Sequence, residues 1–220
     1  MYSLTKVLVL KSQFHKEHDK LSTVYSYEYG KMQVIVPGAK KIAAKLASAT
    51  EPITESEFII HRNHPILRPT VTGGVILKNF IEIKTNFKKN LYALYVAEIV
   101  DSLLPFNLEN SDKYKLILRI LEVISTCQNV KLALCAFTLR FLKLSGYSFF
   151  DYLKSVDTFI SQKTFQHIRE LSNCKGSDID LFEGINAKQV WNYIENYLTN
   201  YMRRPCLSIF LAKMEYLGYN

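Results

Sequence analysis

The sequence predicts two domains of different class: a five-stranded β-barrel over residues 1–82 and an all-α helical domain over residues 83–220. Three observations predict this division. Short N-terminal segments alternate apolar and polar residues with a period of two, as strands do. Gly and Pro residues separate these segments. From about residue 84 onward, apolar residues instead recur every three or four positions, as they do along amphipathic helices.

Five N-terminal segments are rich in the β-branched and aromatic residues that favour strands. They are Lys6–Leu10, Thr23–Tyr29, Lys31–Val36, Glu57–His61 and Thr70–Leu77. One long connection, residues 38–53, follows the third segment. Five short strands with one long connection favour the partly open five-stranded barrel known as the OB fold. Gly73 and Gly74 predict a bulge or corner that lets the last strand curve.

The helical domain is predicted from apolar stripes and from the residues that end them. A first helix stops before Pro105, and Ser111 is a suitable cap for a second. A third runs from about Val130 to Ser145 and ends at Gly146. Because it is apolar on nearly every side, we expect it at the centre of a helix bundle. Asn186, with a glutamine three residues later, predicts the capping box of a further helix.

The composition is that of an ordinary globular protein, with 48% apolar and 22% charged residues. No apolar run approaches the roughly 20 residues that span a bilayer, and "MYSLTKVLVL" lacks the long apolar stretch of a signal peptide. Four cysteines form no C-x-x-C pair, namely Cys127, Cys135, Cys174 and Cys206. We therefore expect reduced thiols in a cytoplasmic protein with no membrane partner.

The net charge of +8 is unevenly spread. Residues 1–90 hold 14 Lys/Arg and 7 Asp/Glu, a net of +7, whereas residues 91–220 hold 14 and 13, a net of +1. This asymmetry predicts a polyanion partner for the N-terminal part, the alternative being a basic protein with no such partner.

A basic arm lies in the long connection, where Lys40, Lys41 and Lys45 stand between Gly38 and Ala49 with no acid. Loops of an OB barrel flank the face on which single-stranded nucleic acid lies. The arm lysines are therefore predicted to contact phosphates without reading sequence. Further cations can add to this surface: Lys11, Lys16, Lys20, Lys31, Arg62 and Arg68. Alternating Tyr25, Tyr27 and Tyr29 can stack bases or, as is more common for alternating tyrosines, belong to the core.

Motifs of enzymes are missing from the sequence: it has no G-x-S-x-G, no H-E-x-x-H and no phosphate loop. His61 and His64 have a spacing that can hold a metal, but no cysteine or acid pair supports them. Glu51, Glu55 and Glu57 are carboxylates of the kind that hold Mg²⁺ in nucleases. They lack a second acidic cluster, so a solvated edge is favoured. We expect no catalysis, no cofactor and no metal.

Four stretches, taken in order, are similar to one protein family. "VLVLKSQFHKEHDKLSTVYSYEYGKMQVIVPGAKK" has the family's succession of strand, polar turn, strand, Gly and strand, followed by Gly and a basic pair. "FKKNLYALYVAEIVDSLLP" resembles the first long helix of the family's second domain. "FTLRFLKLSGY" resembles its central helix with the terminal Gly-Tyr, and "YMRRPCLSIFLAKM" its C-terminal basic-Pro segment. With these four stretches the chain resembles the RecO family of recombination-mediator proteins.

The resemblance implies an OB-fold domain, a helical domain and a non-enzymatic role in DNA repair. Members bind single- and double-stranded DNA and anneal complementary strands. They act with RecR and single-strand-binding protein to load RecA on gapped DNA, which implies a cytoplasmic, nucleoid-associated protein. Matching arm residues imply DNA contact at Lys40, Lys41 and Lys45. Two alternatives remain: an OB-type RNA- or tRNA-binding protein, and a divergent Mg²⁺-dependent nuclease.

The sequence departs from the family in two places. Many members carry a cysteine-rich zinc module after the Gly-Tyr, whereas only Cys174 lies in that stretch here, so no zinc is expected. Ala136 and Thr138 flank Phe137 where members commonly have a basic and an acidic residue.

The predicted central helix is almost wholly apolar, yet its charged residues are all basic: Lys131, Arg140 and Lys143. Their charged ends are expected at the surface beside apolar side chains. Such a surface suits an acidic peptide with a terminal aromatic residue, as in the tail of single-strand-binding protein. The alternative is an ordinary solvated rim. Arg203 and Arg204 complete the predicted partner-binding residues.

Overall fold

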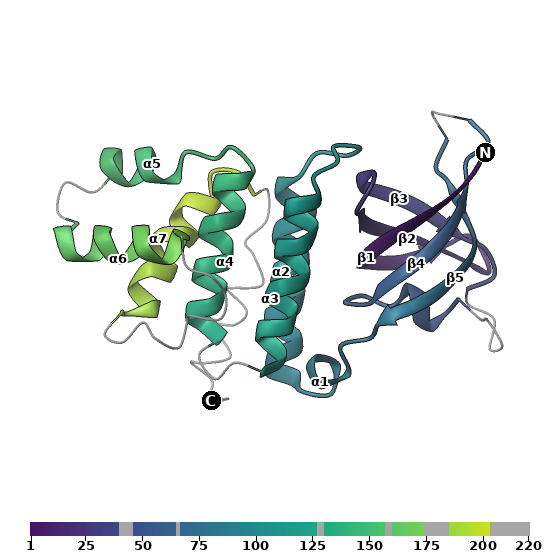
Figure 1. Cartoon of the computed structure of the whole chain (residues 1–220), viewed down its shortest axis with the longest axis horizontal. Helices are drawn as coiled ribbons and strands as arrows, with labels where there is room; N and C mark the ends of the chain where they lie inside the picture. The colour runs from purple at the N-terminus through teal and green to yellow at the C-terminus, as the bar shows by residue number, and fades with distance from the viewer. Residues whose placement is uncertain (40–45, 65–66, 127–129, 157–159, 174–184, 203–220) are drawn as a thin grey trace. The chain divides into compact units, whose positions relative to one another are not determined.

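The computed structural model describes residues 1–39, 46–64, 67–126, 130–156, 160–173 and 185–202. Contacts divide the chain into two compact units. The first comprises Met1–Thr85 with Ala97–Tyr114, and the second Asn86–Val96 with Lys115–Asn220. Two long helices therefore contribute residues to both units (Figure 1).

The first unit is built on a closed five-stranded barrel. Its strands are β1 (Tyr2–His15), β2 (Asp19–Ser26), β3 (Gly30–Val36), β4 (Glu55–His61) and β5 (Thr70–Lys78). The strand order β1-β2-β3-β5-β4 closes on itself because β4 also pairs antiparallel with β1. Strands β3 and β5 meet in parallel at Ile35 and Thr70. This architecture, followed by helices, confirms the predicted fold class.

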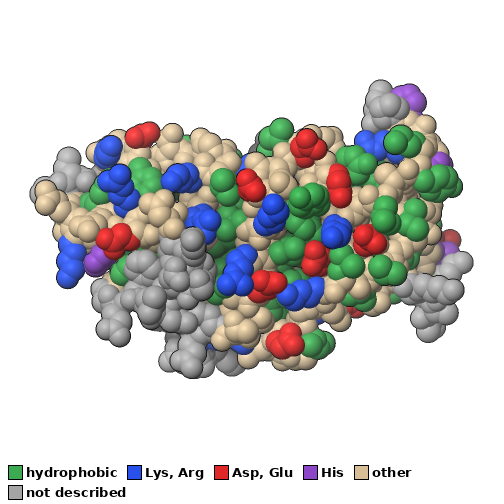
Figure 2. Space-filling model, viewed as in Figure 1, with side chains coloured by type: hydrophobic (Ala, Val, Ile, Leu, Met, Phe, Trp, Pro, Cys, Tyr) green, Lys and Arg blue, Asp and Glu red, His purple; other side chains and the backbone are tan. Residues whose placement is uncertain are grey.

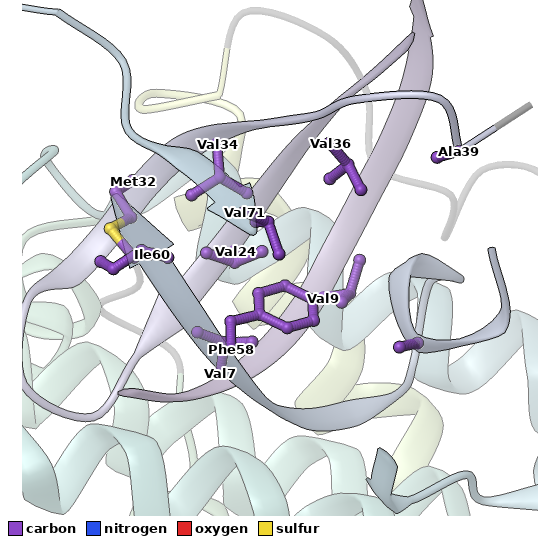
Figure 3. Close-up of a cluster of buried hydrophobic side chains, with 11 residues drawn as sticks. Val7, Val9, Val24, Met32, Val34, Val36, Ala39, Phe58, Ile60 and Val71 are labelled. Carbon is purple, nitrogen blue, oxygen red and sulfur yellow. The ribbon is translucent and has the colours of Figure 1, made fainter. Parts of the chain in front are cut away.

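Alternate residues of the strands point inward and fill the barrel. Figure 3 shows side chains from all five strands pointing into its interior. They are Val7, Val9, Val24, Met32, Val34, Val36, Phe58, Ile60 and Val71, together with Ala39 and Ala49 from the connections. Each of these residues is almost fully buried, so the barrel has a closed apolar core of its own.

The boundaries of β1 and β2 differ most from the prediction, whereas those of β3, β4 and β5 differ by two residues or fewer. Strand β1 continues well beyond Lys6–Leu10 in both directions, because it pairs with β4 at one end and with β2 at the other. Strand β2 begins at Asp19 rather than at Thr23 and ends at Ser26 rather than at Tyr29. The Ser26 hydroxyl accepts hydrogen bonds from the backbone N–H groups of Glu28 (3.2 Å) and Tyr29 (3.1 Å), which closes a turn before β3.

The glycine pair in β5 has the predicted role. Between Ile59 and Ile60 the β4–β5 register shifts and leaves Thr72 as an extra residue, a bulge directly beside Gly73. A Cβ at Gly74 would lie 2.7 Å from the Phe58 ring, so only glycine permits this close approach.

The remaining elements are a short 3₁₀ turn, η1 (Ser48–Thr50), and helices α1 to α7. The helices are α1 (Ile81–Lys84), α2 (Phe87–Leu103), α3 (Ser111–Thr126), α4 (Val130–Leu144), α5 (Phe149–Val156), α6 (Gln162–Asn173) and α7 (Ala187–Leu198). Eleven of the fifteen residues of α4 are buried, and α5, α6 and α7 all pack against it. It is therefore the central helix of the second unit, as predicted. No helix in the described residues is long and apolar enough to cross a membrane.

The helix ends agree with the sequence except at one cap. The Asn186 side chain accepts a hydrogen bond from the Gln189 N–H at 3.2 Å and caps α7 as predicted. Gly146, with φ +80°, ends α4. At α3 the cap is Asn110, whose side chain accepts from the Lys113 N–H at 2.9 Å, and Ser111 is the first helical residue instead.

Candidate nucleic-acid interface

Two predicted cations lie at the ends of the β4–β5 connection and are held against β3 and the turn before it. The Arg62 guanidinium stands over the Tyr29 ring, 5.5 Å from its centroid. Arg68 is exposed, and its Nε donates to the side-chain oxygen of Gln33 at 2.9 Å. A guanidinium has five N–H donors, so a bond through Nε leaves donors for a phosphate. The barrel thus holds two arginines at defined positions.

The basic arm leaves the barrel at a fixed point. The Gly38 N–H donates to the Asp19 carboxylate at 2.9 Å, and Ala39 is buried in the core. Because Asp19 begins β2, the arm starts beside the β1–β2 hairpin, which carries Lys16 and Lys20. The predicted contacts Lys40, Lys41 and Lys45 themselves lie outside the described residues, as do Arg203 and Arg204.

Lys31 has a different environment from the other predicted cations. It is only 5% exposed, and its ammonium donates to the Asp101 backbone oxygen at 2.5 Å. The same ammonium lies 3.7 Å from the Asp101 carboxylate and 4.4 Å from the centroid of the Phe106 ring. Burial lowers the pKa of Lys31, while the negative charge of Asp101 opposes this shift. These contacts join β3 to the last turn of α2 and to the segment after it, and they leave Lys31 little access to a phosphate.

Lys11 shares this acid but is exposed. Its ammonium pairs with the other Asp101 carboxylate oxygen at 2.5 Å, and about half of its side chain is accessible. Asp101 therefore bridges a buried and an exposed lysine. An exposed ion pair of this kind contributes at most about 1 kcal/mol, so Lys11 can exchange its partner for a phosphate at little cost.

The three tyrosines predicted to share a face are separated in the structure. Tyr25 is 1% exposed, stacks with Tyr114 at 6.4 Å between ring centroids, and donates to the Asn110 backbone oxygen. Tyr27 contacts the edge of the same Tyr114 ring, and Tyr29 packs against the barrel core beneath Arg62. The turn at Ser26 breaks the alternation, so the tyrosines form no stacking row.

Two of the three acids considered for Mg²⁺ have another partner. Glu51 lies 3.4 Å from the Lys84 ammonium, and Glu55 accepts from the Tyr114 hydroxyl at 3.0 Å. Burial, and then the charge of Glu55, raise the pKa of Tyr114. Among the described residues no group of three or more His, Cys, Asp or Glu can hold a metal ion. His61 stacks on Tyr2 at 4.3 Å between ring centroids.

A cavity of about 480 Å³ lies among α4, α5 and α6 of the second unit. It combines four aromatic rings with three cations and one acid: Tyr147, Phe149, Phe150 and Phe165, then Lys143, Lys154 and Arg169, and Asp151. Lys143 also donates to the Asn173 side chain at 3.2 Å. In Figure 2, basic side chains gather over α5 and α6, the helices at the left of Figure 1. An apolar recess beside cations suits an acidic ligand with an aromatic end.

The three cations of α4 that were predicted to form one surface lie at different positions along the helix. Lys143 lines the cavity, Arg140 does not, and Lys131 lies twelve residues before Lys143, about 18 Å along the axis. Lys154 and Arg169 were not predicted. Each follows an aromatic residue of the cavity by four positions, Phe150 on α5 and Phe165 on α6. That repeated spacing on two amphipathic helices is the signal that identifies them.

Two models of one protein family match successive parts of this chain. Residues 1–80 match the family described as "Recombination protein O N terminal", and residues 84–149 match "Recombination protein O C terminal". The chain is 33% identical over 141 residues to the "DNA repair protein RecO" of Clostridium perfringens, covering 64% of this chain and 56% of that one.

Two further relatives carry the same name. Identity is 30% over 139 residues with the protein of Desulforamulus reducens, covering 63% of this chain and 53% of the relative. It is 26% over 143 residues with that of Caldicellulosiruptor bescii, covering 65% and 58%. The chain thus spans a little more than half the length of the curated relatives that it matches.

Proposed function

Because the chain belongs to the RecO family of DNA repair proteins, we propose that it is a recombination mediator. In this role it binds single- and double-stranded DNA, anneals complementary strands and, with RecR, helps to load RecA at gaps. It makes and breaks no covalent bond. The observation that carries the proposal is the pair of anchored arginines, Arg62 and Arg68, on a barrel whose basic arm has no acid.

The proposed DNA contacts on the barrel are cations that are not buried, and those on the arm are taken from the sequence. They are Lys11, Arg62 and Arg68 on the barrel and Lys40, Lys41 and Lys45 on the arm. Lys31 is left out because it is buried against Asp101. Contacts to phosphates carry no sequence information. A surface of this kind therefore accepts either strand of a complementary pair, which annealing requires.

The cavity among α4, α5 and α6 is the proposed site for the acidic tail of single-strand-binding protein. Phe149, Phe150 and Phe165 would enclose the terminal aromatic ring, while Lys143, Lys154 and Arg169 would meet the carboxylates. Lys154 and Arg169 thereby supply positive charge to the site. Ala136 supplies none, although family members commonly have a basic residue at that position. Arg203 and Arg204 remain proposed contacts for a protein partner such as RecR.

Strand annealing tests the proposal. Complementary labelled oligonucleotides are mixed with the full chain, with and without single-strand-binding protein, and duplex formation is followed over time. The wild type should accelerate annealing, leave the strands intact in Mg²⁺, and prefer DNA to structured RNA in competition. Annealing no faster than the protein-free rate would refute the proposal.

A variant pair locates the activity on the barrel. Arg62→Gln with Arg68→Gln removes two anchored cations and should lower the salt slope of single-strand binding by roughly 1.4. Lys6→Gln with Lys78→Gln removes the same charge from two exposed residues of β1 and β5 and should leave the slope nearly unchanged. Equal effects of the two variants would show that net charge alone determines binding.

A further inference from the structure

Three lysines stand in the first turns of three helices of the second unit: Lys88 on α2, Lys131 on α4 and Lys188 on α7. All three are exposed. None of these helices has an acid in its first turn. We call these residues the helix-start lysines. Neither the proposed barrel contacts nor the cavity among α4, α5 and α6 includes Lys88 or Lys188.

The packing of α2 on α4 brings the first two together. The Tyr95 hydroxyl lies 3.4 Å from the Thr138 hydroxyl. Lys88 and Lys131 each precede these residues by seven positions, about two helical turns on the same face. Both helices run in the same direction (Figure 1). The first turns of α2 and α4 therefore lie at one end of the unit.

The start of α7 lies beside the start of α4. The Cys135 thiol donates to the Ala187 backbone oxygen at 3.8 Å, and Cys135 is one turn after Lys131 on the same face of α4. Ala187 immediately precedes Lys188. Partial burial, and then the like charges of Lys88 and Lys188, lower the pKa of Lys131. The Lys131 ammonium thus lies close enough to those of Lys88 and Lys188 to be repelled by both.

The first turn of a helix is an unfavourable place for a lysine. The first turn of a helix is its electropositive end, where cations are disfavoured and anions are stabilised. The repulsion of Lys131 by Lys88 and Lys188 adds to that cost. A bound polyanion would relieve both effects, because its charges would face the ammonium groups and the electropositive first turns.

We propose that the helix-start lysines bind the sugar-phosphate backbone of a nucleic-acid strand, an inference that rests on the proposed function. The second unit then carries a strand-binding site of its own, in addition to the barrel. Lysine is a flexible point charge that suits phosphates of variable position better than it fixes a planar carboxylate. Phe87, next to Lys88, is 62% exposed and can stack on a base.

The site is separate from the cavity proposed for an acidic peptide. Lys131 lies about 18 Å along α4 from Lys143, which lines that cavity. One chain can therefore hold a peptide at one end of α4 while a strand occupies the other. With a strand on the barrel and another on the helix-start lysines, two strands are bound to one molecule, which raises their effective concentration for pairing.

The test uses the full chain and a labelled single strand, with binding followed by anisotropy from low to high KCl. The triple variant Lys88→Gln, Lys131→Gln and Lys188→Gln should lower the salt slope by about 2, at roughly 0.7 for each lost contact. The control removes the same charge from exposed residues elsewhere on the second unit, Lys115→Gln, Arg119→Gln and Lys163→Gln. It should leave the slope nearly unchanged.

Thermal unfolding provides a check on the fold. Because the triple variant removes repulsion, its Tm should equal or exceed that of the wild type. If the triple variant fails to fold, Lys131→Gln alone should still lower the slope by about 0.7.

Several outcomes would overturn the inference and spare the proposed function. One is an unchanged slope in the triple variant when Arg62→Gln with Arg68→Gln lowers it. Another is an equal fall in the control variant. A third is an acidic tail peptide that binds the wild type but not the triple variant, which would assign the site to a protein partner. If the wild type itself binds no strand, the proposed function fails instead.

Discussion

Replacing Gly30 by alanine tests how the segment after α2 is held on the barrel. Gly30 has φ +67°, and a Cβ there would lie 2.0 Å from the Leu108 backbone oxygen. Ordinary contact begins at 3.4 Å, so Leu108 would have to move by more than an ångström. The same segment donates the Asn107 N–H to the Lys31 oxygen and places Phe106 beneath the Lys31 ammonium.

The expected loss has two parts. A left-handed conformation at a residue with a side chain costs about 1 to 2 kcal/mol. Moving the segment also disturbs one backbone hydrogen bond, worth about 1 kcal/mol, and the cation–π contact of Lys31, worth about 1 kcal/mol or more. The total is about 3 to 4 kcal/mol. Gly146 is the matched control, because its φ is +80° and a Cβ there would meet nothing within 4 Å.

Thermal unfolding of the two variants separates these parts. For a chain of this size about 1 kcal/mol corresponds to 2–4 °C, so Gly146→Ala should lower Tm by about 2–8 °C and Gly30→Ala by about 6–16 °C. Circular dichroism measures both. Equal shifts would refute the reasoning, because they would mean that only the backbone conformation matters and that the Leu108 contact contributes nothing.

Three further predictions follow from burial and charge. Burial raises the pKa of Tyr25 to about 12 from its usual 10.0. Its contribution to stability is present below pH 10 and lost as the pH rises toward 12, by on the order of 2 kcal/mol; Tyr25→Phe should flatten that loss in alkaline urea titrations. Burial also raises the pKa of Cys135 to about 12, so peptide mapping after thiol labelling at pH 8 should find it modified only in unfolded protein. Lys154→Ala with Arg169→Ala should weaken binding of an acidic, aromatic-ended peptide at least tenfold by anisotropy, and unchanged affinity would exclude the cavity.

The strands were predictable because the barrel interior is filled by alternating residues. Met32, Val34 and Val36 of β3 are buried, and Gln33 and Ile35 between them are less so. The ends of the strands were not predictable in the same way. Local alternation continues through Tyr27 and Tyr29, but the Ser26 hydroxyl binds two backbone N–H groups and forces a turn. Side-chain bonds to the backbone compete with strand pairing, and a period of two cannot reveal them.

The cap of α3 shows a similar limit. Both Asn110 and Ser111 are good caps by residue type. In the structure Asn110 is the cap: its side chain accepts from the Lys113 N–H. Its backbone oxygen also accepts from the hydroxyl of the buried Tyr25. Local sequence does not decide between Asn110 and Ser111 as the cap of α3. The structure pairs the observed cap with Tyr25, a residue 85 positions away in the chain.

The sign of the charge on the barrel was readable from sequence, but the role of each cation was not. Lys31, Arg62 and Arg68 are equivalent in a count of charges. Lys31 is buried because a segment some seventy residues later supplies the Asp101 backbone oxygen and the Phe106 ring. Long-range packing decides which cation stabilises the fold and which remains at the surface. Exposure is therefore the property that a charge count cannot supply.

The basic residues of α4 show how helix geometry changes a functional hypothesis. On sequence, Lys131, Arg140 and Lys143 formed one surface because no acid separates them. At 1.5 Å per residue, the first and last are about 18 Å apart, farther than two lysine side chains can bridge to hold one carboxylate. Each end instead has its own neighbours: Lys154 and Arg169 near Lys143, and Lys88 and Lys188 near Lys131. A single apolar helix with basic residues at both ends can therefore support two sites of different chemistry. The peptide-binding and salt-slope measurements distinguish them, because each variant should change one and leave the other unchanged.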